Sequence, residues 1–459
     1  MLELAAAAHA IGALHKGPNT VFDRVTTDSR NLRKGDLFIG IRGERFDGQG
    51  FAEQALAAGA AGVMVNSGAQ IFSPDAPLIE VDDTRLALGR LAAFWRGRFS
   101  IPLIAITGSN GKTTVKEMLA SILRQVAGDS GVLATAGNLN NDIGMPLTLL
   151  NLTSRHDFAV IEMGMNHLGE ISYLSRLAKP TVALINNAGS AHIGELGSLE
   201  AIARAKAEVF EGLDKSGIAL LNADDSFASY WRDRVRGRRV VSFGIEDNAT
   251  ITARYELGML ASLATFRTPD EEFIATVSIP GIHNVRNALA AVACAYALKI
   301  PTQAIAEGLA AYTGVKGRLQ RKRHPSGATV IDDTYNANPD SMRAAISVLA
   351  AYRGNTFFVM GDMGELGADA EALHSSIGTF AKHSGLNHLF GLGEMSVAAT
   401  RSFGPGASHF SNVEELVNAL SPQLGEGSVV LVKGSRFMRM ERVIEALGAV
   451  NGESALKGT

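Results

Sequence analysis

The chain has 459 residues, of which 46% are hydrophobic and 19% are charged, and its formal net charge is −3. This composition is that of a globular protein and excludes a disordered one, while the length suggests about three domains. The near-neutral charge gives no support for nucleic acid or an anionic membrane surface as a partner.

The single cysteine, Cys294, excludes a disulfide within the chain and favours a reducing compartment. The first residues have the pattern of an amphipathic helix and lack the basic leader of an export signal. No apolar run approaches the length of a membrane span. We therefore expect a cytoplasmic protein with no membrane insertion.

The first unit, residues 1–97, alternates short strands with Ala-rich helices. Strands are expected at residues 36–41, 62–65 and 78–81. Alternation of this kind predicts parallel α/β layers.

The second unit opens with an apolar strand that runs into a glycine-bracketed lysine, within residues 101–114. Apolar residues recur at helical spacing after Lys112, so this lysine begins a helix. Backbone N–H groups and the helix N-terminus then point at one place, where Lys112 would neutralise nucleotide phosphates and Thr113 or Thr114 would bind Mg²⁺. Ile106 stands where the strict phosphate-loop pattern has glycine. The alternative is a turn that only joins strand to helix.

Polar residues follow the next strands of this unit. The strand at 158–162 ends in Glu162, at the edge where open α/β sheets bind ligands. A carboxylate there suits Mg²⁺, directly or through water, although it could instead cap the following turn. The strand at 182–187 leads to His192 at the same edge, where a lone histidine could equally be structural.

Lys206 falls on the apolar stripe of a helix expected at 199–212, four residues after Ile202 and three before Val209. An inward position favours the neutral amine, because burial disfavours the charged form. A neutral amine can react with CO₂ to give a carbamate, which is an anionic metal ligand. The alternative is a lysine that runs along the stripe with its charge in water.

An Asn-rich segment at residues 137–144 includes Asn138 and Asn140. Amides there suit phosphate oxygens or peptide groups, but Asn-Gly clusters also simply form turns.

The second unit comprises residues 98–313, and its sequence pattern changes after residue 226. Alternating segments suggest an antiparallel patch beside the parallel sheet, at residues 239–243, 250–255 and 273–279, before a helix at 284–297.

The third unit, residues 314–459, again alternates strands with helices. Strands are expected at 329–332, 356–360, 388–391 and 428–432, with helices at 340–352 and 370–383. The expected fold is therefore α/β with three domains: a central phosphate-loop parallel sheet with an added antiparallel patch, and a Rossmann-like C-terminal domain.

Taken in order, several segments resemble the ATP-dependent Mur ligases of peptidoglycan synthesis. These segments are residues 107–114, 137–141, 162–164, 187–192, Lys206, 281–287 and 317–318. The resemblance spans nearly the whole chain. Residues 332–339, 361–367 and 432–436 look like the family member that adds D-alanyl-D-alanine to UDP-N-acetylmuramoyl-tripeptide.

The resemblance implies a role for each unit. The first would bind the UDP substrate, through Asp28, Ser29, Arg30, Phe46, Asp47 and Gln49. ATP would be held by Thr107, Gly108, Ser109, Asn110, Gly111, Lys112, Thr113 and Thr114, with His283 or Asn284 and Asn287 near adenine and Arg318 and Asp332 or Asp333 from the third unit.

The same resemblance implies Mg²⁺ as cofactor, with Thr113 and Glu162 at one ion and Glu162, His192 and carbamylated Lys206 at a second. Lys112, Glu162, His192 and Lys206 would thus be the catalytic residues. Substrate contacts would also come from Asn138, Asn140, Tyr335, Asn336 and Asn338. A monomer is expected.

Two alternatives remain at this point. The first is the same chemistry with another amine, in a ligase that adds a single amino acid. The second is a nucleotide-binding switch with weak hydrolysis, against which Glu162, His192 and Lys206 argue, because a switch needs no second cation site.

Overall fold

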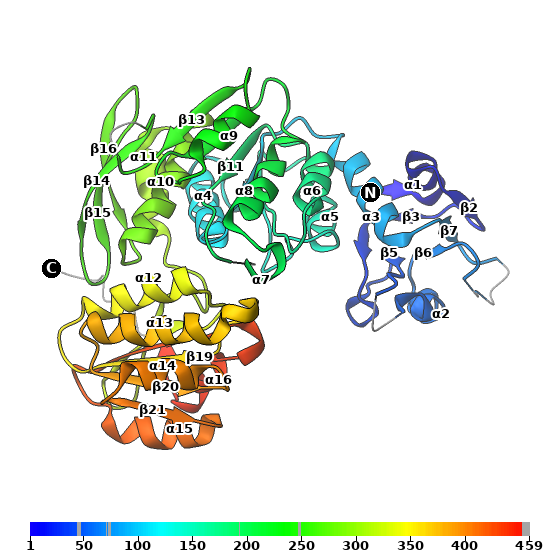
Figure 1. The fold of residues 1–459 in the computed structure, drawn as a ribbon. Helices are drawn as coiled ribbons and strands as arrows, with labels where there is room; N and C mark the ends of the chain where they lie inside the picture. The colour runs from blue at the N-terminus through cyan, green and yellow to red at the C-terminus, as the bar shows by residue number, and fades with distance from the viewer. Residues whose placement is uncertain (44–46, 70, 72–74, 192, 247–248, 452–459) are drawn as a thin grey trace.

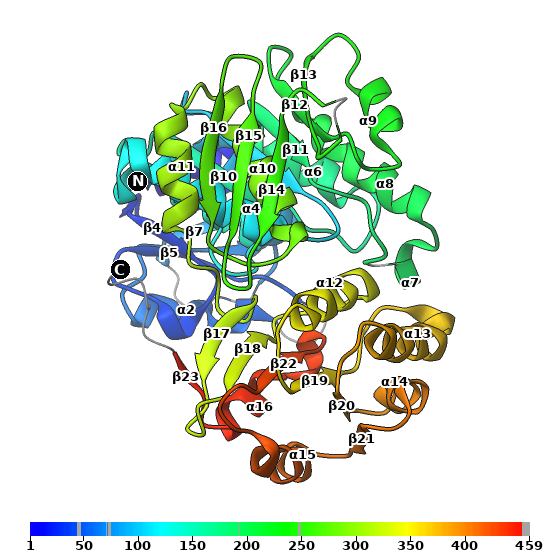
Figure 2. The same ribbon diagram turned by 90° about the vertical axis from the view of Figure 1, so that its left-hand side faces the viewer.

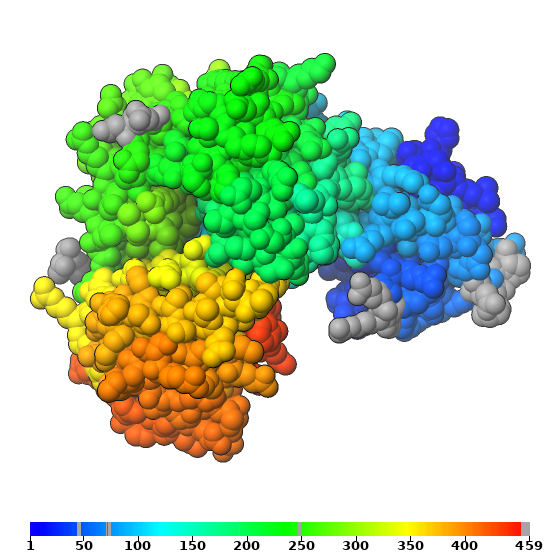
Figure 3. Space-filling view, viewed as in Figure 1, coloured from blue at the N-terminus to red at the C-terminus, as the bar shows by residue number. Residues whose placement is uncertain are grey.

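The computed structural model describes residues 1–43, 47–69, 71, 75–191, 193–246 and 249–451. These residues form three α/β units, and the first and last both adjoin the middle one (Figure 1). On the face shown in Figure 3, a gap separates the first unit from the C-terminal unit. The α/β class and the three-unit architecture expected from the sequence are confirmed.

The first unit is built on a five-stranded sheet with the order β2-β7-β6-β5-β4, in which only the pairing of β2 with β7 is antiparallel. A two-stranded β1–β3 ribbon lies beside it. The elements are β1 (Leu2–Glu3), α1 (Leu4–Ile11), β2 (Leu14–Lys16), β3 (Val21–Phe22), β4 (Arg24–Thr26), β5 (Asp36–Ile39), α2 (Ala52–Ala57), β6 (Gly62–Asn66), β7 (Leu78–Val81) and α3 (Thr84–Arg96).

The middle unit is built on a six-stranded parallel sheet with the order β13-β12-β11-β8-β10-β9. Its strands are β8 (Leu103–Thr107), β9 (Val132–Ala134), β10 (Phe158–Glu162), β11 (Val182–Ile185), β12 (Ile218–Asn222) and β13 (Arg239–Phe243). Its helices are α4 (Lys112–Ala127), α5 (Gly144–Leu149), α6 (Glu170–Ala178), α7 (Ile193–Leu196), α8 (Leu199–Ala207), α9 (Ala228–Arg234), α10 (Ile282–Ala297) and α11 (Thr302–Ala311).

Strand β8 lies in the interior of this sheet and is apolar throughout because helices cover both faces. Alternate side chains enter two different cores, with Ile104 and Ile106 in the layer of α4 and α10 and Leu103 and Ala105 in the layer of α6 and α8. The burial fixes the carboxyl end of β8, and with it the loop that follows.

The antiparallel patch exists, but one of its expected strands belongs elsewhere. Residues 239–243 form β13, which pairs in parallel with β12 at the edge of the main sheet. Residues 241–243 are buried, as expected for a strand of a parallel sheet that is covered on both faces. The patch itself consists of β14 (Thr252–Leu257), β15 (Ser262–Arg267) and β16 (Glu272–Val277), and it covers α10 (Figure 2).

The C-terminal unit is a seven-stranded sheet with the order β21-β20-β19-β22-β18-β17-β23. Its strands are β17 (Gln320–Arg323), β18 (Thr329–Asp333), β19 (Thr356–Gly361), β20 (His388–Leu392), β21 (Ala407–Phe410), β22 (Val429–Lys433) and β23 (Val450–Asn451). Its helices are α12 (Pro339–Ala350), α13 (Ala370–His383), α14 (Ser396–Phe403), α15 (Val413–Leu420) and α16 (Glu441–Ala446). Five strands run parallel, and β17 is antiparallel to both of its neighbours.

Across the described residues, no helix combines the length and apolar character needed to cross a bilayer.

Candidate active site

The loop between β8 and α4 has the backbone that phosphate binding requires. Gly111 precedes the helix at φ +79°, and an added Cβ would lie 2.2 Å from Asn287 Oδ1. Gly108 has φ +152° and its Cβ would lie 3.0 Å from the Asn186 Cβ. Glycine is therefore needed at both places, and the N-terminus of the 16-residue α4 opens at the loop.

Two asparagines that follow β11 hold this loop in place. Asn187 Oδ1 accepts the N–H of Asn110 at 2.8 Å, and its carbonyl accepts the N–H of Ser109 at 3.0 Å. Asn186 Nδ2 donates to the Asn110 carbonyl at 2.9 Å and to Asn287 Oδ1 at 3.1 Å. The loop is thus tied to the neighbouring strand and to α10.

Lys112 curls back over the loop that it follows. Its Nζ donates to the carbonyls of Gly108 at 2.7 Å and Ser109 at 3.3 Å. Burial lowers the pKa of Lys112, although Glu162 opposes this shift. An anion arriving at the loop would favour the charged amine.

Glu162 lies at the carboxyl end of β10 and is almost fully buried. Its Oε2 accepts the hydroxyl of Thr113 at 2.8 Å, and its Oε1 accepts an N–H of Asn140 at 2.8 Å. The Glu162 N–H donates to Thr135 Oγ1 at 2.9 Å. The expected pair of Thr113 and Glu162 is therefore in direct contact, and one amide of the Asn-rich segment orients the carboxylate.

Lys206 points inward, as its place on the helix predicts, and its side chain is fully buried in α8. Its Nζ has no hydrogen-bond partner among the described residues. Burial, reinforced by repulsion from Lys112, lowers the pKa of Lys206 well below its ordinary value. Burial therefore favours the neutral amine, the state in which a lysine can react with CO₂.

His192 and Phe46 lie outside the described residues. Within the ranges that are described, no group of three or more His, Cys, Asp and Glu side chains is arranged to hold a metal ion. The oxygens of Thr113 and Glu162 fit the donor set that the sequence suggests for Mg²⁺, because Mg²⁺ prefers oxygen ligands. The unpartnered Lys206 amine would join this set only as a carbamate, whose donor atoms are oxygens.

A second group of polar side chains lies at the start of α10. Asn287 Nδ2 donates to Asn284 Oδ1 at 3.2 Å, and Asn284 Nδ2 donates to the Pro280 carbonyl at 2.8 Å. Burial lowers the pKa of His283 to about 4, so its ring is neutral at pH 7. These three side chains, with Thr114, line a cavity of about 610 Å³ between the middle and C-terminal units.

The C-terminal unit reaches the loop through Arg318. Its Nη2 donates to Thr113 Oγ1 at 3.0 Å, and its guanidinium lies over the Tyr335 ring, 4.2 Å from the centroid. Asp333 lines the cavities on both sides of this contact. Asp332, one residue earlier on β18, lines neither and instead pairs with Lys322. Of the two aspartates, the geometry favours Asp333.

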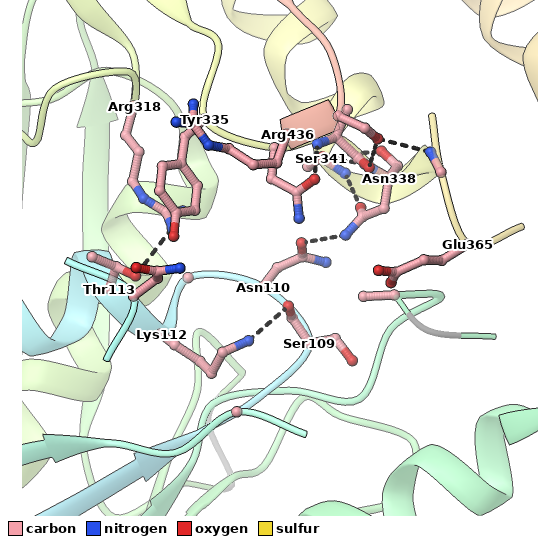
Figure 4. A pocket seen from close by; sticks show the side chains of 18 of the residues that line it. Ser109, Asn110, Lys112, Thr113, Arg318, Tyr335, Asn338, Ser341, Glu365 and Arg436 are labelled. Carbon is pink, nitrogen blue, oxygen red and sulfur yellow. Dashed lines mark hydrogen bonds between the residues drawn. The ribbon is translucent and has the colours of Figure 1, made fainter. Parts of the chain in front are cut away.

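The main cavity, of about 740 Å³, has one wall from the middle unit and one from the C-terminal unit. The loop and Lys112 form the lower wall in Figure 4, and Arg318, Tyr335 and Asn338 face them. Asn338 Nδ2 donates across to Asn110 Oδ1 at 2.8 Å. The expected residues that line this cavity are Ser109, Asn110, Gly111, Lys112, Thr113, Asn138, Asn140, Glu162, Arg318, Asp333, Tyr335, Asn336 and Asn338.

Thr107 and Gly108 do not line this cavity. Thr107 ends β8, where its hydroxyl donates to the Met163 carbonyl at 3.0 Å, and Gly108 begins the loop.

The expected residues of the first unit that the structure describes lie in two loops that follow the adjacent parallel strands β4 and β5. Arg30 donates to the carboxylate of Asp28, which precedes Ser29, and this contact lowers the pKa of Asp28 to about 2. Asp47 accepts the N–H of Gln49 at 3.0 Å. Both loops are therefore at the ligand-binding edge of their sheet.

Several residues of the site were not predicted. Asn186 and Asp225 follow β11 and β12 at the carboxyl edge, a position that alone marks them as candidates. Asp225 accepts the N–H of Ala188 at 2.8 Å, and burial raises its pKa. Lys433, the last residue of β22, and Arg436, which follows the strand, line the main cavity. Both belong to a segment noted only for its resemblance.

Comparison with known families matches all three units. The model described as "Mur ligase family, catalytic domain" matches residues 21–96, "Mur ligase middle domain" matches 106–295, and "Mur ligase, glutamate ligase domain" matches 317–436. The UDP-N-acetylmuramoyl-tripeptide–D-alanyl-D-alanine ligase of Escherichia coli (strain K12) is 42% identical over 436 residues, which cover 94% of this chain and 95% of that protein. The chain belongs to the Mur ligase family. The expectation drawn from its motifs is confirmed.

Solved Mur ligase structures share the whole fold. MurF from Acinetobacter baumannii is 36% identical, with a TM-score of 0.90 and coverage of 97% of this chain and 98% of that one. MurF ligase from Thermotoga maritima, solved in complex with ADP, is 28% identical with a TM-score of 0.82, covering 92% and 96%.

Proposed function

We propose that this Mur ligase uses ATP to join D-alanyl-D-alanine to UDP-N-acetylmuramoyl-tripeptide. The observation that carries the proposal is the main cavity, which has the phosphate loop on one wall and the strand ends of the C-terminal unit on the other. A γ-phosphate held at Lys112 would face Tyr335 and Asn338 across the cavity (Figure 4), which Asn336 also lines. The E. coli relative, whose name states this reaction, supports the choice of substrates.

Peptide-bond formation from a free carboxylate needs activation, because its leaving group would otherwise be oxide. The γ-phosphoryl group moves from ADP oxygen to the carboxylate of the tripeptide and gives an acyl phosphate. The dipeptide amine attacks the acyl carbon, the C–N bond forms, and phosphate leaves with one of the original carboxylate oxygens. The attacking neutral amine loses one proton to solvent or a nearby base and keeps the other as the amide N–H.

The residues of the loop carry the electrostatic part of the first step. The N-terminus of α4 and Lys112 attract the phosphates, and Arg318 brings a second cation from the C-terminal unit. Thr113 and Glu162 would hold Mg²⁺, and bound Mg²⁺ would neutralise charge on the phosphate oxygens. Asn110 and Asn338 join the two walls. Closure of the walls on the bound substrates would exclude the water that hydrolyses an acyl phosphate.

A second Mg²⁺ would be held by Glu162, His192 and the carbamate of Lys206. The carbamate forms when the neutral amine attacks CO₂ and loses one proton. Burial without a partner supports this modification, since a plain ammonium there would repel the ion.

The remaining units complete the substrate set. His283, Asn284 and Asn287 would surround adenine, and Asp28, Ser29, Arg30, Phe46, Asp47 and Gln49 would bind the UDP moiety. The 1–97, 98–313 and 314–459 divisions would be the domains for UDP substrate, ATP and incoming dipeptide. One copy of the chain supplies every residue of this scheme, which fits a monomer, and its nucleotide substrates fit the cytoplasm.

Phosphate release tests the proposal. With ATP and UDP-N-acetylmuramoyl-tripeptide, release should require D-alanyl-D-alanine, and Lys112→Ala should abolish it. Release with lysine or diaminopimelate in place of the dipeptide would indicate a ligase for a single amino acid. ATP hydrolysis at the same rate with and without UDP-N-acetylmuramoyl-tripeptide and D-alanyl-D-alanine would indicate a nucleotide switch.

A further inference from the structure

The described residues contribute four cationic side chains to the main cavity, and two of them serve the phosphate loop. Lys112 donates to the carbonyls of Gly108 and Ser109. Arg318 donates to Thr113 at 3.0 Å. Both charges are therefore placed where ATP phosphates would lie.

The third cation, Lys433, is already neutralised. Its side chain is only 5% exposed and its Nζ lies 2.6 Å from Asp333 Oδ2. The same Nζ donates to the Asn336 carbonyl at 2.9 Å. A buried pair of this kind holds the two strand ends together and leaves no net charge for a ligand.

The fourth cation, Arg436, is different. Its side chain is 65% exposed and lines the cavity, and its Nη1 donates to Glu441 Oε1 at 3.1 Å. Its other N–H donors have no hydrogen-bond partner in the part of the chain that the structure describes. A guanidinium carries five donors in a fixed plane, so one edge can rest on Glu441 while another binds a carboxylate.

The backbone beneath Arg436 is fixed by Ser435, which is buried. The Ser435 hydroxyl donates to the Ala337 carbonyl at 3.2 Å and accepts the N–H of Gly364 at 2.8 Å. The Ser435 N–H donates to the Asp362 carbonyl at 3.0 Å. Arg436 thus begins from a point where the carboxyl ends of β18, β19 and β22 are pinned together.

We propose that Arg436 binds the terminal carboxylate of the incoming dipeptide and so selects an amine substrate with a free carboxylate. This inference rests on the function proposed above. Figure 4 shows Arg436 on the wall opposite Lys112 and Ser109. A dipeptide whose amine faces the acyl phosphate at the loop would direct its carboxylate toward this wall.

Charge makes a cation at this end necessary. The carboxylates of Glu162, Asp333 and Glu365 line the cavity, Asp333 being paired with Lys433, and the cavity would receive phosphate anions as well. A further carboxylate without a cation of its own would be repelled, whereas a charge-assisted pair with Arg436 fixes both its position and its direction. Phe437, 64% exposed beside Gly364, offers an apolar surface for an alanine methyl group.

The test compares D-alanyl-D-alanine with D-alanyl-D-alaninamide, which keeps the amine and loses the anionic carboxylate. For the wild-type enzyme, kcat/KM for the dipeptide should exceed that for the amide by about 10- to 100-fold. Arg436→Ala should lower kcat/KM for the dipeptide to the level of the amide and leave the KM for ATP unchanged. Arg436→Lys should recover part of the preference, because the charge remains but the planar donors do not.

Arg401→Ala removes the same charge from an exposed position on α14, outside the cavity, and should keep the full preference. The inference is overturned if Arg436→Ala still prefers the free carboxylate, or if the wild type accepts the amide equally well. Wild-type enzyme that turns over neither compound would remove the proposed function itself. If the wild type ligates the dipeptide and Arg436→Ala has the same preference for it as the wild type, the inference is wrong but the proposed function stands.

Discussion

Replacing Lys206 with methionine separates a catalytic lysine from a merely packed one. The Lys206 side chain is fully buried, and its Nζ lacks a hydrogen-bond partner among the described residues. A buried polar group without a partner costs about 1 to 3 kcal/mol of stability. Methionine has a similar length and no polar hydrogen, so Lys206→Met should raise the free energy of unfolding by about 1 to 2 kcal/mol and the melting temperature by a few degrees.

The same substitution removes the carbamate, and ligation should therefore fall by roughly 100-fold or more, a loss of about 3 kcal/mol in transition-state stabilisation. Phosphate release measures the activity, and thermal and urea unfolding measure the stability. Added bicarbonate should not restore Lys206→Met, since no amine remains to accept CO₂.

Lys116 supplies a matched control, because its side chain on α4 is equally buried but has partners. Its Nζ donates to the Thr135 carbonyl and lies 2.6 Å from Glu117 Oε1. Lys116→Met should lower the free energy of unfolding by about 2 to 4 kcal/mol. Full activity of Lys206→Met, or a loss of stability as large as that of Lys116→Met, would refute the assignment of Lys206.

Three further predictions concern residues of the proposed nucleotide site. Gly111→Ala should weaken ADP binding at least about tenfold in calorimetry, because the added Cβ would lie 2.2 Å from Asn287 Oδ1 at φ +79°; unchanged affinity would contradict the loop geometry. Arg318→Ala should lower kcat by about 100-fold, since the cation that contacts Thr113 is lost, and Arg318→Lys should recover only part of the rate. If only the KM for ATP changes, Arg318 does not stabilise the transition state. In the folded protein the pKa of His283 is lowered from 6.5 to about 4. Between these two values the unfolded chain binds the proton more tightly than the folded chain, so wild-type stability should fall as the pH drops from 6.5 toward 4. His283→Gln should lose less stability over the same pH range. If the melting temperatures of the wild type and His283→Gln fall equally with pH, His283 is not a source of the pH dependence.

The sequence was sufficient where one pattern determines both structure and chemistry. The run into Lys112 predicted strand β8, the loop and α4 together, since only a strand followed by a helix brings the lysine and Thr113 to the same point. The inward position of Lys206 followed from helical spacing alone and is confirmed by its full burial.

The remainder depended on contacts between distant parts of the chain. Arg318 and Thr113 are 205 residues apart, and nothing local to either predicts that they meet. Asp332 and Asp333 could not be distinguished, because successive residues of a strand face opposite sides and the sequence does not say which side holds the cavity. The edge strand β13 was assigned to the antiparallel patch because alternating residues before a turn look alike in both kinds of sheet.

The transfer of oxygen during ligation tests the central claim most directly. UDP-N-acetylmuramoyl-tripeptide labelled with ¹⁸O in its reacting carboxylate should be ligated to D-alanyl-D-alanine with ATP, and the released phosphate analysed by mass spectrometry. Activation as an acyl phosphate predicts that each phosphate carries one oxygen from the carboxylate. Phosphate without label, formed together with the ligated product, would contradict the activation of this carboxylate by ATP.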